Sequence, residues 1–171
     1  MDGTLAVIWL ITSLADMGLN ECASGCVAQR DAPSRLWVQG GQVIFQEEEI
    51  GEEIYVGYDA PRRYGPFQIT YGASITDEGA GWVGAGATWT TRNFSDGPFF
   101  IETSFMPGLY AQGDGPDLGG VLHFRSAFGA GYIFDNGATL TVSYDHRSNG
   151  DIQDLNPGLE TLSVRYAVRL N

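Results

Sequence analysis

The sequence predicts an all-β protein with the fold of an eight-stranded antiparallel up-and-down transmembrane β-barrel. After Pro33 the chain divides into short segments in which apolar and polar residues alternate, with turn residues between them. Eight such segments can be counted, and an even number suits a closed barrel. The composition agrees, because a chain of 171 residues with 24 glycines and 12% aromatic residues fits a β protein better than a helical one.

The first 28 residues are expected to form a signal peptide, which leaves a single barrel domain over residues 29–171. Residues 5–14 form an apolar run that has the length of a signal-peptide core and is too short to span a bilayer as a helix. Val27 is flanked by the small residues Cys26 and Ala28, which suit the −3 and −1 positions of a cleavage site.

The charges of this leader are atypical. Asp2 lies where a signal peptide usually carries positive charge, and Asp16 and Glu21 lie before the expected cleavage site. Lipidation at Cys26 stays open as an alternative, although the preceding residues resemble a lipoprotein box only weakly. A disulfide between Cys22 and Cys26 would link no part of the barrel core.

The expected strands follow one another with short connections. They run roughly over residues 35–46, 52–60, 66–77, 80–93, 98–112, 120–134, 138–148 and 159–170. The first of them breaks the alternation at residues 42–45, which predicts a β-bulge there.

The connections are of two kinds, and each kind is expected at one end of the barrel. Short turns lie at residues 62–65, 93–97 and 135–137, and longer loops at 47–53, 112–119 and 148–158. In outer-membrane barrels the short turns are periplasmic and the longer loops extracellular. The acidic segment 47–53 is therefore expected to be a solvated extracellular loop.

The residue types on the two faces of the strands predict which face meets lipid. In segments 66–77 and 120–134 one face carries Phe, Tyr, Ile and Leu, and the other carries small, polar or charged residues. The second set suits the narrow polar lumen of an eight-stranded barrel, so the apolar face is expected to point outward. A soluble lipocalin-like barrel, which would turn the apolar face inward, is the alternative.

Charged residues on the lumen face are expected to form a buried polar network. His123 and Arg125 share that face of one strand and would interact with Glu102 and Asp145 on others.

The charge balance excludes one class of partner. The formal net charge is −12, and all 9 basic residues are arginine. Binding of nucleic acid needs clustered cations, so a nucleic-acid partner is not expected. The sequence also contains no cluster of metal-ligating residues and no glycine-rich phosphate loop, so no cofactor and no metal are expected.

Three polar residues interrupt the apolar, lipid-facing rows of the last two strands. His146 and Ser148 continue the outward row of one strand, and Glu160 begins the outward row of the next. A serine nucleophile needs a base, and the base needs a third group that orients it; serine, histidine and a carboxylate supply these roles together. The alternative is that the three residues only mark the membrane boundary, where polar side chains are tolerated.

The stretch over residues 146–160 resembles the signature of the PagL-type lipid A 3-O-deacylase family. It reads His-x-Ser-Asn, then a short loop, then Asn-x-Gly-aliphatic-Glu at the start of the last strand. The resemblance implies an eight-stranded outer-membrane barrel with Ser148 as nucleophile, His146 as general base and Glu160 as the group that orients it.

The same resemblance assigns residues of the following loop. Asn149 would help to form the oxyanion hole, with Gly150, and Asn156 and Gly158 would shape the site. The chain departs from the family in having Asp151 where a glycine is usual, which places a carboxylate beside the expected oxyanion.

The expected function is that of an outer-membrane serine esterase of a Gram-negative bacterium. It would remove the ester-linked 3-O acyl chain from lipid A of lipopolysaccharide, with its active site toward the outer leaflet, and a homodimer is left open. The alternatives are a non-enzymatic barrel, either an adhesin or a structural protein, and an outer-membrane phospholipase.

Overall fold

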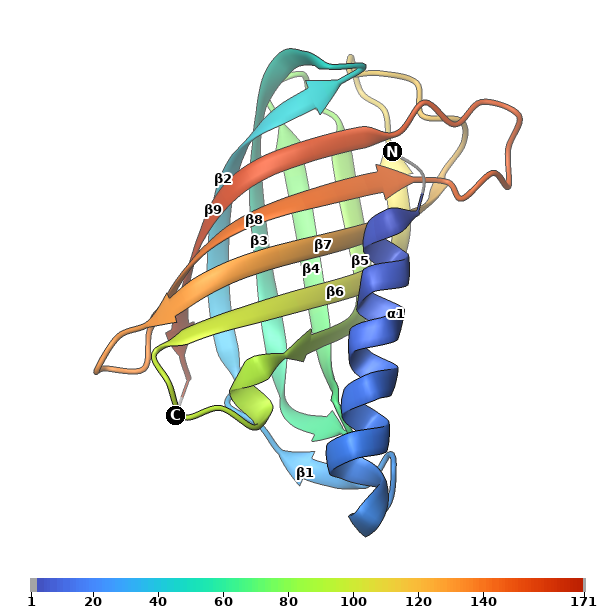
Figure 1. Ribbon diagram of the computed structural model, residues 1–171. Helices are drawn as coiled ribbons and strands as arrows, with labels where there is room; N and C mark the ends of the chain where they lie inside the picture. The colour runs from blue at the N-terminus through green and yellow to red at the C-terminus, as the bar shows by residue number, and fades with distance from the viewer. Residues whose placement is uncertain (1–2, 171) are drawn as a thin grey trace.

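Eight strands close into an antiparallel barrel in the computed structural model, which describes residues 3–170 (Figure 1). Each strand pairs with its neighbours in the chain, and β9 pairs with β2 to close the barrel. The strands are β2 (Arg35–Phe45), β3 (Glu48–Tyr64), β4 (Phe67–Thr76), β5 (Gly81–Thr90), β6 (Phe99–Ala111), β7 (Leu122–Ile133), β8 (Thr139–Ser148) and β9 (Leu159–Arg169). The predicted fold class is therefore confirmed.

The N-terminal segment lies outside the barrel wall. Helix α1 (Thr4–Asp16) runs along the wall, two short helical turns follow it, and β1 (Gln29–Asp31) pairs with the end of β3. The segment Thr4–Ser24 is long and apolar enough to cross a membrane, a test that a signal sequence also passes. Cys22 and Cys26 form a disulfide away from the barrel core. Asp2 lies outside the described residues.

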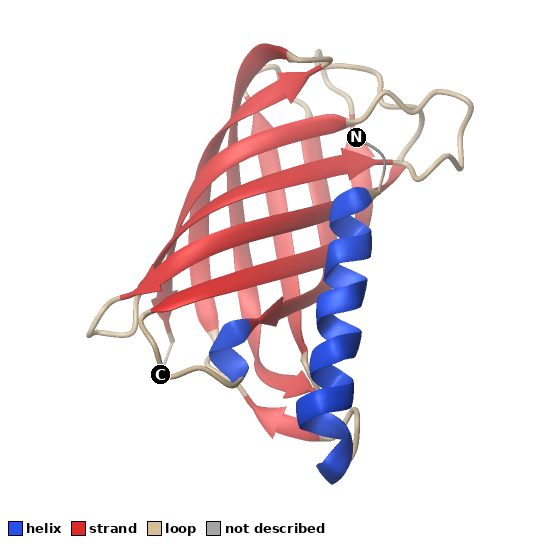
Figure 2. Cartoon of the chain, in the orientation of Figure 1, coloured by secondary structure: helices blue, strands red, loops and turns tan. Residues whose placement is uncertain are grey.

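Figure 2 shows the strands that form the barrel wall, in red. Alternation of side chains along these strands separates an apolar outer wall from a polar lumen, as the sequence predicts. On β8 the outward Leu140 and Val142 are exposed, whereas the intervening Thr141 and Ser143 are buried. Exposed aliphatic side chains on a membrane barrel are the ones that face lipid.

Side chains fill the lumen. Aromatic rings pack against glycines of neighbouring strands: a Cβ on Gly57 would lie 2.0 Å from the ring of Trp37, and one on Gly72 would lie 2.3 Å from the hydroxyl of Tyr55. Two lumen cavities measure about 20 and 10 Å³. A cavity of that size holds about one water molecule, so a lipid cannot enter the lumen.

Buried ion pairs cross the lumen. Arg125 donates to Asp145 Oδ2 at 2.7 Å, as expected, and also to Glu53 Oε1 at 2.8 Å. Arg147 donates to the second oxygen of Glu53 at 2.5 Å. Glu102 is paired with two other arginines, Arg92 and Arg165, and not with Arg125.

His123 does not join these ion pairs, contrary to expectation. It is fully buried, and its Nε2 lies 3.0 Å from the carbonyl oxygen of Gly120.

Two features predicted for the first hairpin, a bulge and a loop, can be compared with the structure. The register of β2 against β3 shifts between Val43 and Ile44, so the predicted bulge is confirmed. The expected loop over residues 47–53 is wrong, because β3 already begins at Glu48. Gln46 and Glu47 both have positive φ, 51° and 72°, and together they form the two-residue turn that joins the strands.

Candidate active site

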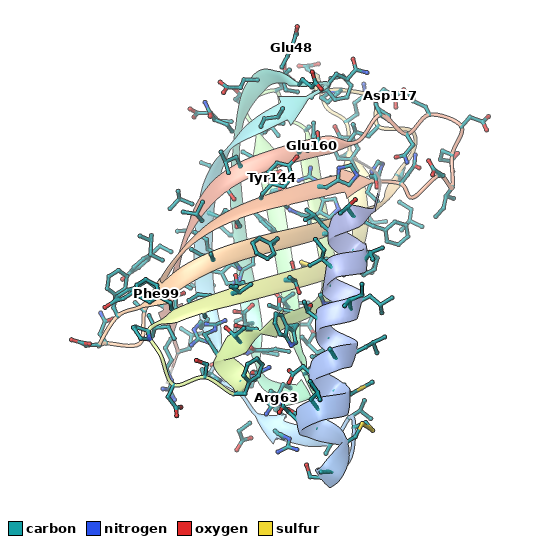
Figure 3. All side chains as sticks on the ribbon, in the orientation of Figure 1. Glu48, Arg63, Phe99, Asp117, Tyr144 and Glu160 are labelled. Atoms are coloured by element: carbon teal, nitrogen blue, oxygen red, sulfur yellow. A yellow bond between two sulfur atoms is a disulfide. The ribbon has the colours of Figure 1, made fainter. Side chains whose placement is uncertain are left out.

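His146 and Glu160 lie side by side on the outer wall. They are direct partners across the β8–β9 ladder, and His146 Nδ1 lies 3.0 Å from Glu160 Oε1. Figure 3 shows Glu160 above Tyr144 on this wall, near the end of the barrel where β8 finishes. Both side chains of the pair are largely buried, so their hydrogen bond is shielded from solvent. The structure thus brings together two of the three residues expected to form a triad.

Ser148 ends β8 and lies two residues from His146 on the same face. Within residues 3–170 its hydroxyl makes no hydrogen bond with His146. Catalytic hydrogen bonds of this kind often form only when substrate binds. Ser148 and His146 both line a pocket of about 430 Å³. The other lining residues are Gly3, Gly150, Asp151, Asn156, Pro157 and Gly158.

Gly158 fixes one side of the histidine ring. A Cβ at this position would lie 2.7 Å from His146 Cε1, closer than side-chain atoms approach one another. The absence of a side chain therefore lets the loop pack directly on the imidazole. Gly158 also has φ of 76°, a left-handed conformation that favours glycine.

The side chain of Asn149 holds two loops together. It is fully buried, and its Nδ2 lies 3.1, 2.8 and 2.6 Å from the carbonyl oxygens of Leu118, Gly119 and Leu155. An amide nitrogen has two hydrogens to donate, so these carbonyls use both. Its backbone N–H donates to Asn156 Oδ1 at 3.0 Å.

A tight turn follows the serine. Gly150 and Asp151 both have left-handed φ, 65° and 60°, and Ile152 N–H donates to the carbonyl of Asn149. Asp151 Oδ1 accepts a hydrogen bond from Asn156 Nδ2 at 2.8 Å, which orients the carboxylate toward that residue. Among the residues that the structure describes, the backbone N–H of Gly150 has no hydrogen-bond partner.

Two neighbours of His146 and Ser148 were not predicted from the sequence. Ser126 pairs with His146 across the β7–β8 ladder and is a buried polar residue on the outward face. The sequence contains a signal for Ser126, because this polar residue lies between Phe124 and Phe128 in a row of outward-facing side chains. Arg147 lies between His146 and Ser148 in the chain but points into the lumen, where it pairs with Glu53.

Comparisons with known proteins bear on the family and the fold of the chain. The family model described as lipid A 3-O-deacylase (PagL) matches residues 49–169. No curated protein sequence matches the chain. The crystal structure of the outer membrane enzyme PagL is similar at 20% identity, with a TM-score of 0.65, over 80% of this chain and 99% of that one.

Other solved barrels share the fold alone. Neisserial surface protein A (NspA) is similar with a TM-score of 0.58 and 11% identity, over 84% of this chain and 99% of that one. A de novo designed transmembrane β-barrel is similar with a TM-score of 0.57 and 12% identity, over 82% of this chain and 98% of that one. Since the PagL family model covers most of the chain and ends beyond Glu160, the chain belongs to the PagL family of lipid A 3-O-deacylases, carboxylic ester hydrolases of the outer membrane.

Proposed function

We propose that the protein is a serine esterase that removes the 3-O acyl chain of lipid A in the outer leaflet. Ser148 is the nucleophile, His146 the general base and Glu160 the group that orients the base. The observation that carries this proposal is the 3.0 Å contact between His146 Nδ1 and Glu160 Oε1, two residues from a serine on the same outward row.

The contact with Glu160 determines which histidine nitrogen can act as the base. A carboxylate oxygen accepts a hydrogen bond, so Nδ1 carries the hydrogen and Nε2 has a free lone pair. Nε2 takes the proton from the Ser148 hydroxyl as its Oγ attacks the ester carbonyl, which forms a C–O bond. The proton then passes to the departing sugar oxygen as the ester bond breaks, and water hydrolyses the acyl-serine by the reverse roles.

The developing oxyanion needs hydrogen-bond donors that are not already used. The amide of Asn149 is occupied by three carbonyls, whereas the N–H of Gly150 makes no hydrogen bond within the described residues. We therefore assign the oxyanion contact to the backbone of Gly150 and give Asn149 the role of a positioning residue. Backbone N–H groups held in place in this way are typical oxyanion donors.

The ester reaches Ser148 from the side, through the lipid phase. The outward neighbours of the site along β8 and β9 are apolar and exposed, and the two lumen cavities described above measure about 20 and 10 Å³. A diacyl or hexa-acyl lipid can present an ester to the outer wall without leaving the bilayer, which suits a substrate of the outer leaflet.

The test is to refold the purified protein and supply it with lipopolysaccharide or with phospholipid in separate reactions. Mass spectrometry of the lipid products is expected to show loss of one ester-linked hydroxyacyl chain from lipid A only. Release of fatty acid from phospholipid would favour a phospholipase. The absence of any product from a folded barrel would favour a non-enzymatic role.

Replacing Asn149 by alanine is expected to lower kcat by about 10²-fold, because displacing a reacting group by roughly 1 Å can have that effect. The two loops that Asn149 joins would separate, so limited proteolysis should cut the 149–158 loop faster in the variant. Turnover and proteolysis are measured on the same refolded sample.

Asn136→Ala is the matched control for this prediction. Asn136 also holds a turn, since its Oδ1 accepts from Ala138 N–H at 3.0 Å, but it lies in the β7–β8 connection at the other end of the barrel. Its activity is expected to equal that of the unmodified protein. A large loss of kcat in Asn149→Ala with unchanged proteolysis would instead make Asn149 a direct oxyanion donor.

A further inference from the structure

The pocket that holds Ser148 and His146 contains a carboxylate for which the proposed reaction has no use. Asp151 lines this pocket, and no arginine does so. Apart from Gly3 of the N-terminal segment, the lining residues come from β8 and the loop that follows it. The carboxylate and the proposed nucleophile therefore belong to one continuous segment and lie three residues apart.

A hydrogen bond holds this carboxylate at the pocket. Asn156, which also lines the pocket, donates from Nδ2 to Asp151 Oδ1 at 2.8 Å and accepts at Oδ1 from Asn149 N–H at 3.0 Å. The amide of Asn156 is thereby fixed in one orientation, with its donor end toward Asp151. Asp151 is exposed, and this partner is a neutral amide, so the hydrogen bond leaves the negative charge in place.

The loops around the site supply no cation. The chain contains no lysine, and arginine is absent from all four connections at this end of the barrel, residues 46–47, 77–80, 112–121 and 149–158. Each of these connections contains at least one acidic residue. An anionic group that approaches the pocket from the loops therefore meets like charge.

The arginines of the barrel lie elsewhere. Arg125 and Arg147 belong to strands next to the site, but both are buried and pair with Glu53 in the lumen. Figure 3 shows Asp117 at the same end of the barrel as Glu160, and Arg63 at the opposite end. The pocket is thus acidic, with no exposed basic side chain among its lining residues.

A charge of this sign distinguishes between forms of lipid A. The sugar that carries the 3-O chain can also carry a phosphate at its 1-position, so the phosphate and the ester to be cleaved belong to one ring. When the ester lies at Ser148, the rest of that ring lies in or beside the pocket that Asp151 lines. Protein sites that accept phosphate usually supply arginine or lysine, and this pocket supplies the opposite charge.

We propose that Asp151 is a specificity-determining residue that disfavours a phosphate on the sugar next to the ester. The preferred substrate is then a lipid A that lacks the 1-phosphate, an inference that rests on the proposed function. Repulsion between like charges weakens binding of the phosphorylated lipid and of its transition state, and it leaves the other lipid unaffected.

The test compares two lipids that differ by this phosphate. Diphosphoryl lipid A and the monophosphoryl form made from it by removal of the 1-phosphate are supplied to the refolded protein in micelles of non-ionic detergent with EDTA. The value of kcat/KM is expected to be about fivefold or more higher for the monophosphoryl form. Two unit charges about 4 Å apart already change an equilibrium constant by about fivefold in water, and a phosphate monoester carries more than one charge.

Asp151→Asn removes the charge and keeps the size of the side chain and an oxygen that can accept from Asn156. Asparagine also tolerates the left-handed φ of 60° at this position. The ratio of the two kcat/KM values is expected to fall to about 1. A general effect of the carboxylate on the oxyanion would change both rates by the same factor, so only the ratio reports the phosphate.

Asp154→Asn is the matched control. Asp154 is exposed in the same loop but does not line the pocket, so the ratio is expected to equal that of the unmodified protein. Salt provides a second measurement, which needs no variant. Raising the salt concentration from about 0.01 M to about 1 M shortens the Debye length about tenfold, so the ratio of the unmodified protein should decrease.

The outcomes separate this inference from the proposed function. Equal hydrolysis of the two lipids by the unmodified protein, or faster hydrolysis of the diphosphoryl form, would overturn the role of Asp151 and leave the esterase intact. A preference that Asp151→Asn retains, or one that salt does not reduce, would overturn it as well. Hydrolysis of neither lipid by the folded, unmodified protein would refute the esterase itself.

Discussion

Ser148→Ala is expected to reduce deacylation of lipopolysaccharide by about 10⁴–10⁶-fold, the loss usually seen when a serine nucleophile is removed. The barrel should stay folded, because the side chain faces outward and belongs to no lumen contact. The measurement is the rate of acyl release from purified lipopolysaccharide, with heat-modifiable mobility as the check on folding.

His146→Ala should cause a loss of the same order, and the double variant should be little worse, because nucleophile and base act as one unit. Glu160→Ala is expected to retain more activity than either. Ser143→Ala is the matched control on the same strand: its side chain faces the lumen, where Oγ lies 2.9 Å from Ser163 Oγ. Near-normal turnover by Ser148→Ala would show that Ser148 is not the nucleophile.

Glu53→Ala is expected to lower the free energy of unfolding by about 3–5 kcal/mol, the typical effect of breaking a buried ion pair from one side. The carboxylate is 2% exposed and is shared between Arg125 and Arg147, so its loss leaves Arg147 without a counter-ion at that position. Such a change is a large fraction of the stability of most domains. The midpoint of urea unfolding in detergent, followed by tryptophan fluorescence, measures it.

Glu52→Ala is the neighbouring control. Glu52 is exposed on the outer side of the same strand, and its loss should change the unfolding midpoint little. If Glu53→Ala unfolded at the same urea concentration as Glu52→Ala, the lumen ion pairs would contribute no net stability.

The alternation of side chains made the barrel and its outward face predictable. A one-residue shift of register would move every apolar side chain to the other face, so the pattern determines orientation strongly. The same logic located the bulge near Val43, where alternation fails. It did not locate the first turn, because Gln46 and Glu47 adopt positive φ without the glycine or asparagine that usually signals it.

Contacts across the lumen were only partly predictable. Strand parity shows that Arg125 faces inward but not which strand lies opposite, and its partner Glu53 is 72 residues away in the chain. The pairing of His146 with Glu160 could be predicted from the sequence, because the two residues lie on adjacent strands joined by one loop. The position of the Asn149 side chain depends on a loop from another hairpin, which no local pattern encodes.

The packed lumen also bears on the membrane that surrounds the protein. Rings of Trp37 and Tyr55 rest on glycines of neighbouring strands, and the ion pairs of Glu53 occupy the space beside them. We expect a barrel filled in this way to hold no continuous column of water, and therefore to conduct neither ions nor small antibiotics. The cell can therefore place many copies of this enzyme in its outer membrane without weakening the permeability barrier that the same lipids provide.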